Sequence, residues 1–293
     1  MNMKKTKGEK AFSVFNVIFL AVISIICLYP MLYVAFASCS SSQMLMRHTG
    51  LLLHPMGFNL NAYVKVFQNP MIVKGYANTL IILVLGVSVN MILTALGAFF
   101  LTRQNVYFKK HIMLLIIFTM YFSGGMIPTY LTVRSLGLYN TVWAVILPTA
   151  VSTYNLIIMR TGFASIPRGL DEAATIDGAN QFVIFSRIYL PLSKAILAVI
   201  FLYYAVGSWN AWFNASIYLN DREKYPLQLV LREILISNDT GSRISDGSMS
   251  DFEGIGLSIK YAAIMVSTLP ILVVYPFIQK YFVKGVLIGS LKG

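Results

Sequence analysis

Long uncharged stretches recur along the chain and indicate its architecture. Six of them lack Lys, Arg, Asp and Glu over about 20 residues, the length that an α-helix needs to cross the hydrocarbon core of a bilayer. They are residues 14–37, 77–102, 112–133, 136–159, 195–219 and 261–279. None alternates polar and apolar side chains as a barrel strand does, and backbone groups in lipid must be satisfied within the segment. The pattern predicts an all-α, polytopic protein with six transmembrane helices in a single domain over residues 1–293.

Composition and charge support a membrane location. Hydrophobic residues make up 57% of the chain and charged residues 12%, about half of the roughly 25% that soluble domains carry. The 13% of aromatic residues argue against disorder. With both termini in the cytoplasm, most basic residues fall inside and most acidic ones outside, as the positive-inside rule requires. The formal charge of +12 therefore reflects topology and contact with lipid headgroups, and no nucleic-acid partner is expected.

Several kinds of chemistry are missing from the sequence. There is no glycine-rich Lys-Ser/Thr loop for nucleotide phosphates, so any ATP and Mg must be bound by a partner chain. The three histidines are not spaced as metal ligands, and we expect no metal site, no cofactor and no catalytic residue in this chain. No charged residue lies within the six apolar segments, which argues against a proton-driven carrier.

The loop at residues 165–191 carries helical signals of its own. Pro167 marks a helix entry, and Asp171 and Glu172 are expected in the first turn, where the helix dipole favours acids. Gly178 then ends the helix, and an apolar stripe at helical spacing follows it. The pattern predicts two short amphipathic helices joined at a glycine. A helix with small outward residues and one carboxylate suits a groove on another protein.

The residues of this loop resemble the EAA motif of the membrane subunits of ATP-binding cassette (ABC) importers. The matching positions are Glu172, Ala173, Ala174, Gly178, Ile188, Leu190 and Pro191. Six helices, a polar outer loop and the C-terminal segment also resemble the carbohydrate-uptake branch of this family. Residues 122–130 and 207–213 look most like permeases for complex oligosaccharides, including polygalacturonan, rhamnogalacturonan and alginate systems.

The resemblance implies the type I ABC importer permease fold and a coupling role for the loop. In the family this loop docks into a cleft of the ATPase, so Glu172 is expected to pair with a basic residue there. Ala173 and Ala174 would form the close-contact face and Gly178 the turn. The expected ATPase-coupling residues are Glu172, Ala173, Ala174, Asp177, Gly178, Ile188, Leu190 and Pro191.

The resemblance also implies partners and a location. The working unit would contain a second homologous permease, making a heterodimer, together with two copies of an ABC ATPase and an extracytoplasmic sugar-binding protein. The substrate would be an oligosaccharide, and the assembly would lie in the bacterial cytoplasmic membrane in contact with its lipid. The tail is expected to fray or to contact the ATPase through Lys284, Gly285, Gly289 and Lys292.

Candidate pathway residues have packing alternatives. Trp209, Asn210, Trp212 and Asn214 offer aromatic faces and amides to a sugar, but an interfacial aromatic belt or interhelical hydrogen bonds explain them as well. Asn78, Asn90 and Asn155 are better explained as interhelical hydrogen-bonding residues. Gly124 and Gly125 could unwind the third segment beside a cavity or form a packing kink. The outer loop at residues 220–260, with residues 47–74, is the surface available to a binding protein.

Two functions from other classes remain as alternatives. One is a secondary carrier that works without an ATPase. The other is a membrane-embedded enzyme acting on lipid-linked sugars, which needs converging titratable residues at the membrane interface. The nearest such cluster, Asp171, Glu172 and Asp177, lies inside the docking motif.

Overall fold

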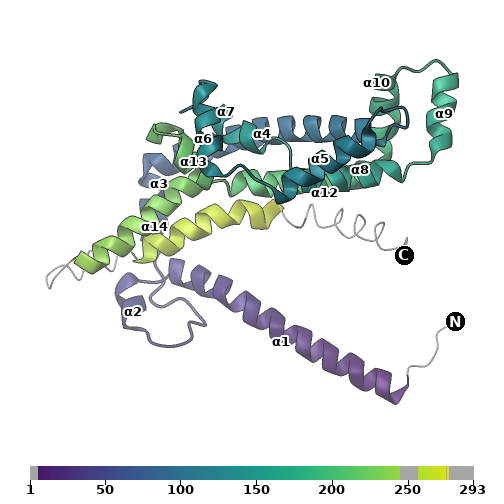
Figure 1. Cartoon of the computed structure of the whole chain (residues 1–293). Helices are drawn as coiled ribbons and strands as arrows, with labels where there is room; N and C mark the ends of the chain where they lie inside the picture. Colours follow the sequence, from purple (N-terminus) through teal and green to yellow (C-terminus); the bar gives the residue numbers. More distant parts are fainter. Residues whose placement is uncertain (1–5, 245–256, 275, 277–293) are drawn as a thin grey trace. The chain divides into compact units, whose positions relative to one another are not determined.

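The computed structural model describes residues 6–244, 257–274 and 276, and within these ranges every regular element is a helix (Figure 1). Contacts group the chain into two compact units. The first unit contains Met1–Asn69 and Glu233–Thr268, and the second contains Pro70–Arg232 and Leu269–Gly293. Each unit is described separately.

In the first unit the longest helix is α1, Lys7–Ser38. A capping box begins it, because the Thr6 hydroxyl accepts from the Glu9 amide at 3.3 Å and the Glu9 carboxylate accepts from the Thr6 amide at 2.8 Å. Two short helices follow, α2 (Ser42–Arg47) and α3 (Asn61–Gln68). A small core forms around Ala37, Leu45 and Leu52, and Leu257 and Tyr261 from the helix Leu257–Val274 pack against it.

The second unit is built around α4, Pro70–Thr102. Two helices, α8 (Thr153–Ala164) and α12 (Lys194–Trp209), pack along it and share its main core. Further helices of this unit include α5 (Lys109–Tyr121), α6 (Met126–Ser135), α7 (Val142–Ile146), α11 (Leu190–Leu192), α13 (Phe213–Tyr218) and α14 (Leu227–Ile244), which continues into the first unit. Short 3₁₀ turns occur at Leu147–Thr149 and Arg222–Lys224.

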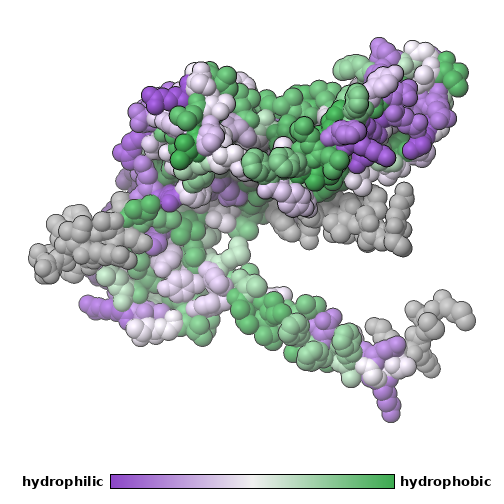
Figure 2. Space-filling model, in the orientation of Figure 1, coloured by the Kyte–Doolittle hydropathy of each residue, from purple (hydrophilic) through white to green (hydrophobic). Residues whose placement is uncertain are grey.

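At one end of the second unit lies the 165–191 loop, with α9 (Arg168–Ile176) and α10 (Gln181–Ile184). The opposite end carries α6, α7 and α13 (Figure 1). Hydrophobic side chains cover the middle of this unit and hydrophilic ones gather at both ends (Figure 2). This distribution suits a bundle that crosses an apolar layer.

Three helices are long and apolar enough to span a membrane: Lys7–Ser38, Pro70–Thr102 and Leu257–Val274. Three further helix pairs also qualify if each bent pair counts as one span. Their bend angles are 112° for Lys109–Tyr121 with Met126–Ser135, 55° for Val142–Thr149 with Thr153–Ala164 and 84° for Gln181–Leu192 with Lys194–Trp209. The described part of the chain therefore contains up to six spans by length and composition.

The apolar segments at 112–133, 136–159 and 195–219 are not continuous helices in the structure. The first breaks after Tyr121, where Gly125 adopts a φ of +90° that favours glycine. In the second, helix begins only at Val142, and a break with Pro148 just before it separates α7 from α8. The third ends at Trp209 before α13 resumes at Phe213. Uniform hydrophobicity shows where a chain can cross lipid but not where its helices break.

Candidate functional site

Two short helices in the 165–191 loop meet at Gly178, as the pattern predicts. The C-terminus of α9 forms a complete Schellman motif: the Gly178 amide donates to the Thr175 carbonyl at 3.1 Å, and the Ala179 amide donates to the Ala174 carbonyl at 2.9 Å. This closure places Gly178 at a φ of +79°, where a side chain would strain the backbone. Asp177 is the C-cap of α9 and is exposed. The glycine of the motif is thus required by backbone geometry.

The second helix of the loop begins with a side-chain cap and contains a widened turn. The Asn180 side-chain oxygen accepts from the Val183 amide at 2.9 Å, which starts α10. The chain then forms a π-helical turn over Phe185–Tyr189, in which the Leu190 amide donates to the Phe185 carbonyl. Pro191 has no amide to donate and would clash with the preceding turn of a regular α-helix, so the wider turn accommodates it.

The motif residues after the glycine have different environments. Ile188 and Leu190 pack against the core of the second unit, whereas Pro191 is exposed. The apolar stripe that the sequence predicts after Gly178 would begin with Phe182. Instead 72% of its surface is exposed, while Phe185 is buried. The stripe is split because only part of it faces the bundle.

The sequence expectation needs two corrections in α9. The helix begins at Arg168, so Asp171 lies in its first turn and Glu172 lies just beyond it. Ala173 is exposed, but Ala174 is partly buried against the core of the second unit. Consecutive helical positions point about 100° apart, so Ala173 and Ala174 do not form one outward face. The outward face instead carries Glu172, Ala173 and Ile176, which is 86% exposed.

The inward face of α9 is tied to the end of α4 by an ion pair that the sequence reading missed. Arg103, the residue after α4, pairs with the Oδ2 atom of Asp171, and the Tyr189 hydroxyl donates to the same oxygen at 3.4 Å. The Arg103 guanidinium lies 5.1 Å from the centre of the Phe99 ring. Burial opposes the charge of Arg103, but the hydrogen bond and ion pair with Asp171 outweigh it, so the pKa of Arg103 is raised.

Other cations converge on the C-terminus of α4. The Lys109 ammonium donates to the Thr102 and Arg103 carbonyls at 3.2 and 2.9 Å, and Arg160 donates to the Leu101 carbonyl at 3.4 Å. These groups satisfy carbonyls that a helix end leaves unpaired and complement the negative end of the helix dipole. Basic residues near this loop therefore cap the C-terminus of α4.

A groove of about 670 Å³ separates the segment after α4 from α9. Arg103 and residues 104–106 line one side, and Arg168, Asp171 and Glu172 line the other. With its amide oxygen turned toward Arg168, Gln104 accepts from the guanidinium at 2.9 and 3.3 Å. The groove therefore contains both a basic and an acidic side chain next to the outward face of α9.

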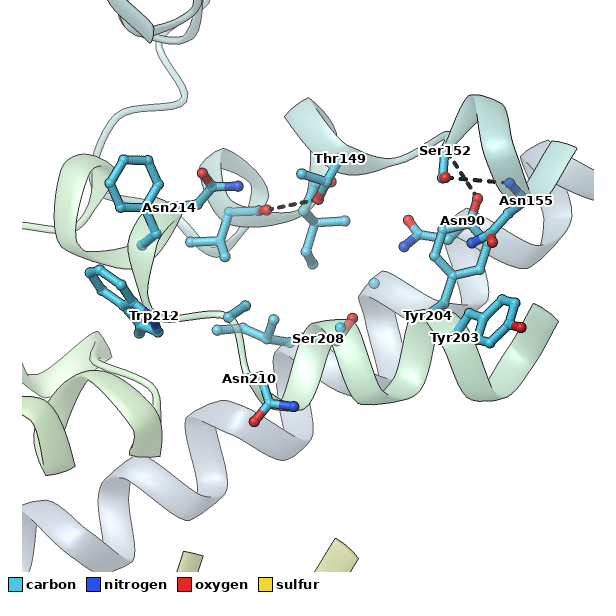
Figure 3. Close-up of a pocket in the computed structure, with 17 residues that line it drawn as sticks. Asn90, Thr149, Ser152, Asn155, Tyr203, Tyr204, Ser208, Asn210, Trp212 and Asn214 are labelled. Atoms are coloured by element: carbon cyan, nitrogen blue, oxygen red, sulfur yellow. Dashed lines mark hydrogen bonds between the residues drawn. The ribbon is translucent and has the colours of Figure 1, made fainter. Parts of the chain in front are cut away.

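A second cavity, of about 400 Å³, lies along α4 between α8, α12 and α13 (Figure 3). None of the described residues that line it is charged. Its polar groups are hydroxyls and amides, together with the Trp212 indole. They belong to Asn90, Thr149, Ser152, Asn155, Tyr203, Tyr204, Ser208, Asn210, Trp212 and Asn214. Such a lining offers hydrogen-bond donors and acceptors to the hydroxyl groups of a polar molecule.

The predicted pathway residues do not all reach this cavity. Asn210, Trp212 and Asn214 line it, and the Arg232 guanidinium lies 3.6 Å from the centre of the Trp212 ring. Trp209 is buried against Tyr76, with ring centroids 6.2 Å apart, and is not part of the lining. The glycines Gly124 and Gly125 lie at the α5–α6 break, also outside the lining.

Two of the asparagines expected to join helices instead join α4 to the connecting segments that pack on it. The Asn78 amide donates to the Glu223 and Tyr225 carbonyls at 2.7 and 3.1 Å. Turned to its hydrogen-bonded orientation, the buried Asn90 amide donates to the Gly86 and Ala150 carbonyls at 2.9 and 3.2 Å. Asn90 therefore joins α4 to the segment before α8 and lines the cavity at the same time.

Sequence reasoning missed the hydroxyl network behind the cavity. The Tyr204 hydroxyl bonds to the Thr94 hydroxyl at 2.7 Å. It also accepts from the Ser152 backbone amide at 3.0 Å, while the Ser152 hydroxyl accepts from the Asn155 backbone amide at 3.4 Å (Figure 3). These residues come from three apolar segments. Their small polar side chains are the available signal, but no spacing along the chain connects them.

The predictions for the C-terminal tail, for part of the outer loop and for metal binding concern residues other than those of the two sites above. The tail residues Lys284, Gly285, Gly289 and Lys292 and part of the 220–260 loop lie outside the described residues. Among the described residues no group of three or more His, Cys, Asp or Glu side chains could hold a metal ion.

Comparison with known proteins gives a consistent result over nearly the whole chain. A family model described as "Binding-protein-dependent transport system inner membrane component" matches residues 2–288. Protein LplC of Bacillus subtilis (strain 168) is 43% identical over 291 residues, covering 99% of this chain and 98% of LplC. The polygalacturonan/rhamnogalacturonan transport system permease protein YtcP of the same organism is 43% identical over 282 residues, covering 94% and 96%.

A solved structure is similar over the same length. The crystal structure of a bacterial ABC transporter involved in the import of the acidic polysaccharide alginate contains a chain that matches with a TM-score of 0.86 and 31% sequence identity. The match covers 96% of this chain and 100% of that chain. The structural match and the sequence matches thus both extend over nearly the whole chain.

Proposed function

The chain belongs to the family of binding-protein-dependent transport system inner membrane components, and on that premise we propose that it is the permease subunit of an ATP-driven ABC importer for oligosaccharides. The names of its relatives, which include a polygalacturonan/rhamnogalacturonan system and an alginate importer, support the substrate class. The permease has no enzymatic activity of its own in this proposal. ATP and Mg are bound by a separate ATPase chain.

The proposed assembly lies in the bacterial cytoplasmic membrane, surrounded by lipid. It contains this chain, a second and different permease, two copies of an ABC ATPase and an extracytoplasmic sugar-binding protein. The family description supports the binding protein, because transport in this family depends on one. The second permease completes a translocation pathway of which this chain forms half.

The outward face of α9 is the proposed ATPase contact, and it carries the coupling argument. Glu172 and Ala173 are exposed, and Ile176 has 86% of its surface exposed; Phe182, in the following helix α10, has 72% exposed. Apolar side chains exposed to this degree beside a carboxylate suit a partner groove that contains a basic residue. Gly178, Ile188, Leu190 and Pro191 shape and anchor the loop, and Asp177 ends α9 beside the contact.

The neutral cavity is the proposed part of the sugar pathway in this chain. Its amides and hydroxyls can exchange hydrogen bonds with sugar hydroxyls, and Trp212 can offer an aromatic face. Closure of the ATPases would move the loop and open the bundle to the outside, so that the cavity is exposed alternately on the two sides. The tail residues Lys284, Gly285, Gly289 and Lys292 are proposed to contact the ATPase as well.

The experiment that tests this function is affinity purification of the tagged chain from its native membrane in a mild detergent. Mass spectrometry should identify an ABC ATPase, a second permease of similar length and a sugar-binding protein. The binding protein can then be screened against oligosaccharides. Recovery of the chain without an ATPase, repeated in a second detergent, would contradict the proposal and favour a carrier or an enzyme.

A further inference from the structure

The two adjacent acids of α9 have different surroundings. Glu172 is exposed on the outward face, whereas the Asp171 side chain is 23% exposed and points toward the bundle. We propose that Arg103, Asp171 and Tyr189 form a latch that fixes α9 to the end of α4, so that the docking loop and the cavity-lining helix move as one body. This inference rests on the proposed function, because it concerns how a movement of α9 reaches the cavity.

The latch joins three separate parts of the second unit. Arg103 follows α4, Asp171 belongs to α9, and Tyr189 belongs to the π-helical turn after α10. The Tyr189 ring packs edge-on against Phe99 of α4 and Phe163 of α8, with ring centroids 4.9 and 5.5 Å apart. The polar contacts of the latch therefore lie against a fixed aromatic cluster, which limits the positions that Asp171 can take.

Apart from the hydrogen bonds between Gln104 and Arg168, few other contacts hold α9 in place among the described residues. None of its residues is fully buried, and Ala174 is the residue of α9 that packs partly against the core. The ion pair with Arg103 is shielded from solvent, with 19% and 23% of the two side chains exposed. A shielded pair is screened less by salt than an exposed one and loses more when one partner is removed. The position of α9 relative to α4 therefore depends strongly on this pair.

The connection continues from the latch to the cavity through α4. This helix is unbroken from Pro70 to Thr102, and Asn90 and Gly86 line the cavity from its middle. Asn90 is 12 residues before Thr102, which corresponds to about 18 Å of continuous helix. An unbroken helix of this length transmits a displacement of its end, so α4 is the mechanical link between the loop and the cavity.

The test compares cavity accessibility with and without ATPase closure. The complex carries Ser208→Cys on α12, which lines the cavity opposite Gly86, in a background with Cys27→Ser and Cys39→Ser. A membrane-impermeant maleimide measures the labelling rate before and after addition of ATP and orthovanadate. With the latch intact we expect this rate to change at least threefold.

Asp171→Asn and Arg103→Gln should each reduce the change to less than 1.5-fold while the ATPase still co-purifies. The double variant should be no worse than either single variant, because the residues act as one unit. Arg103→Lys, which keeps the charge, should recover part of the change. The matched control is Glu223→Gln, which removes the exposed ion pair with Lys74 near the other end of α4 and should keep the full change.

The outcomes separate the latch from the proposed function. A full rate change in Asp171→Asn with the ATPase bound would overturn the latch and leave the proposed function intact. Loss of the ATPase from Asp171→Asn would place Asp171 in the docking contact and would also overturn the latch. Absence of an ATPase from the complex with native Asp171 would refute the proposed function and the latch together.

Discussion

The two sites along α4 use opposite chemistry. Beyond its C-terminus, Arg103, Asp171 and neighbouring cations form a charged joint in which position depends on ion pairs. In the middle of the helix the cavity is lined by amides, hydroxyls and apolar groups, with no charge among its described lining residues. An ion pair fixes the relative position of two elements, whereas a neutral lining lets a hydroxyl-rich molecule exchange partners. The charged site therefore suits a fixed connection between α4 and α9, and the neutral cavity suits reversible binding of a hydroxyl-rich molecule.

The largest effect is expected from a change of charge on the outward face of α9. Glu172→Lys should leave the chain inserted in the membrane, because Glu172 is exposed and outside the latch. The reversed charge should repel the basic residue of the ATPase, and we expect at least a tenfold loss of co-purified ATPase or of ATP-coupled transport. Glu223→Gln serves as the control, and unchanged uptake by Glu172→Lys would remove α9 from the coupling role.

The second largest effect is expected at Gly178, in the turn that ends α9. Gly178→Val places a β-branched residue at a φ of +79°, which costs at least about 1–2 kcal/mol although nothing lies within 4 Å of an added Cβ. We expect α9 to unwind from its C-terminus and the loop to be cleaved several-fold faster by a protease. Gly178→Asn should be milder, since Asn tolerates this conformation. Equal cleavage of both variants and the parent would contradict the role of the turn.

An effect of intermediate size is expected from a substitution in the hydroxyl network at the cavity. Tyr204→Phe removes the hydroxyl that bonds to Thr94 and that accepts from the Ser152 amide. Leaving these partners unsatisfied should lower the free energy of unfolding by about 1–3 kcal/mol. Thermal unfolding in detergent measures the loss. Tyr107→Phe is the control, because Tyr107 is 89% exposed, and it should unfold like the parent.

The smallest effect should come from the weakest contact of the latch. Tyr189→Phe removes a long hydrogen bond of 3.4 Å to Asp171 but keeps the ring that packs against Phe99. The ATP-dependent change in Ser208→Cys labelling should fall by less than twofold. A loss as large as that of Asp171→Asn would mean that the tyrosine hydroxyl is as necessary as the arginine for holding α9.

The latch should also be insensitive to pH in the working range. Burial disfavours the charge of Arg103, but Asp171 more than compensates, so the pKa of Arg103 is raised. A raised pKa means that alkali removes the Arg103 contribution to stability only as the pH rises through that raised pKa, far above the working range. The labelling change should therefore be constant from pH 7 to pH 9, and a decline over that range would point to another titrating group.

Local features of the loop were predictable because they depend on neighbours in the chain. Gly178 ends α9, and the stretch after it forms a second short helix, since both depend on a few consecutive residues. The breaks at Gly125 and before α8 were harder to predict, because glycine or proline in an apolar run is compatible with a kink or a complete interruption. The different burial of Ala173 and Ala174 depends on which side of α9 faces the bundle.

The order of apolar runs, the charge distribution and the motif at residues 165–191 were enough to establish an all-α membrane protein related to ABC importer permeases. The helical membrane architecture follows from transfer of side chains into lipid and from short-range backbone preferences, whereas the family relationship rests on the resemblance of the motif residues. The Arg103–Asp171 pair and the network of Thr94, Ser152 and Tyr204 join positions 50 to 110 residues apart, and no local preference specifies them. The hydroxyl network exists because α4, α8 and α12 pack together, and the ion pair exists because α9 lies against the end of α4.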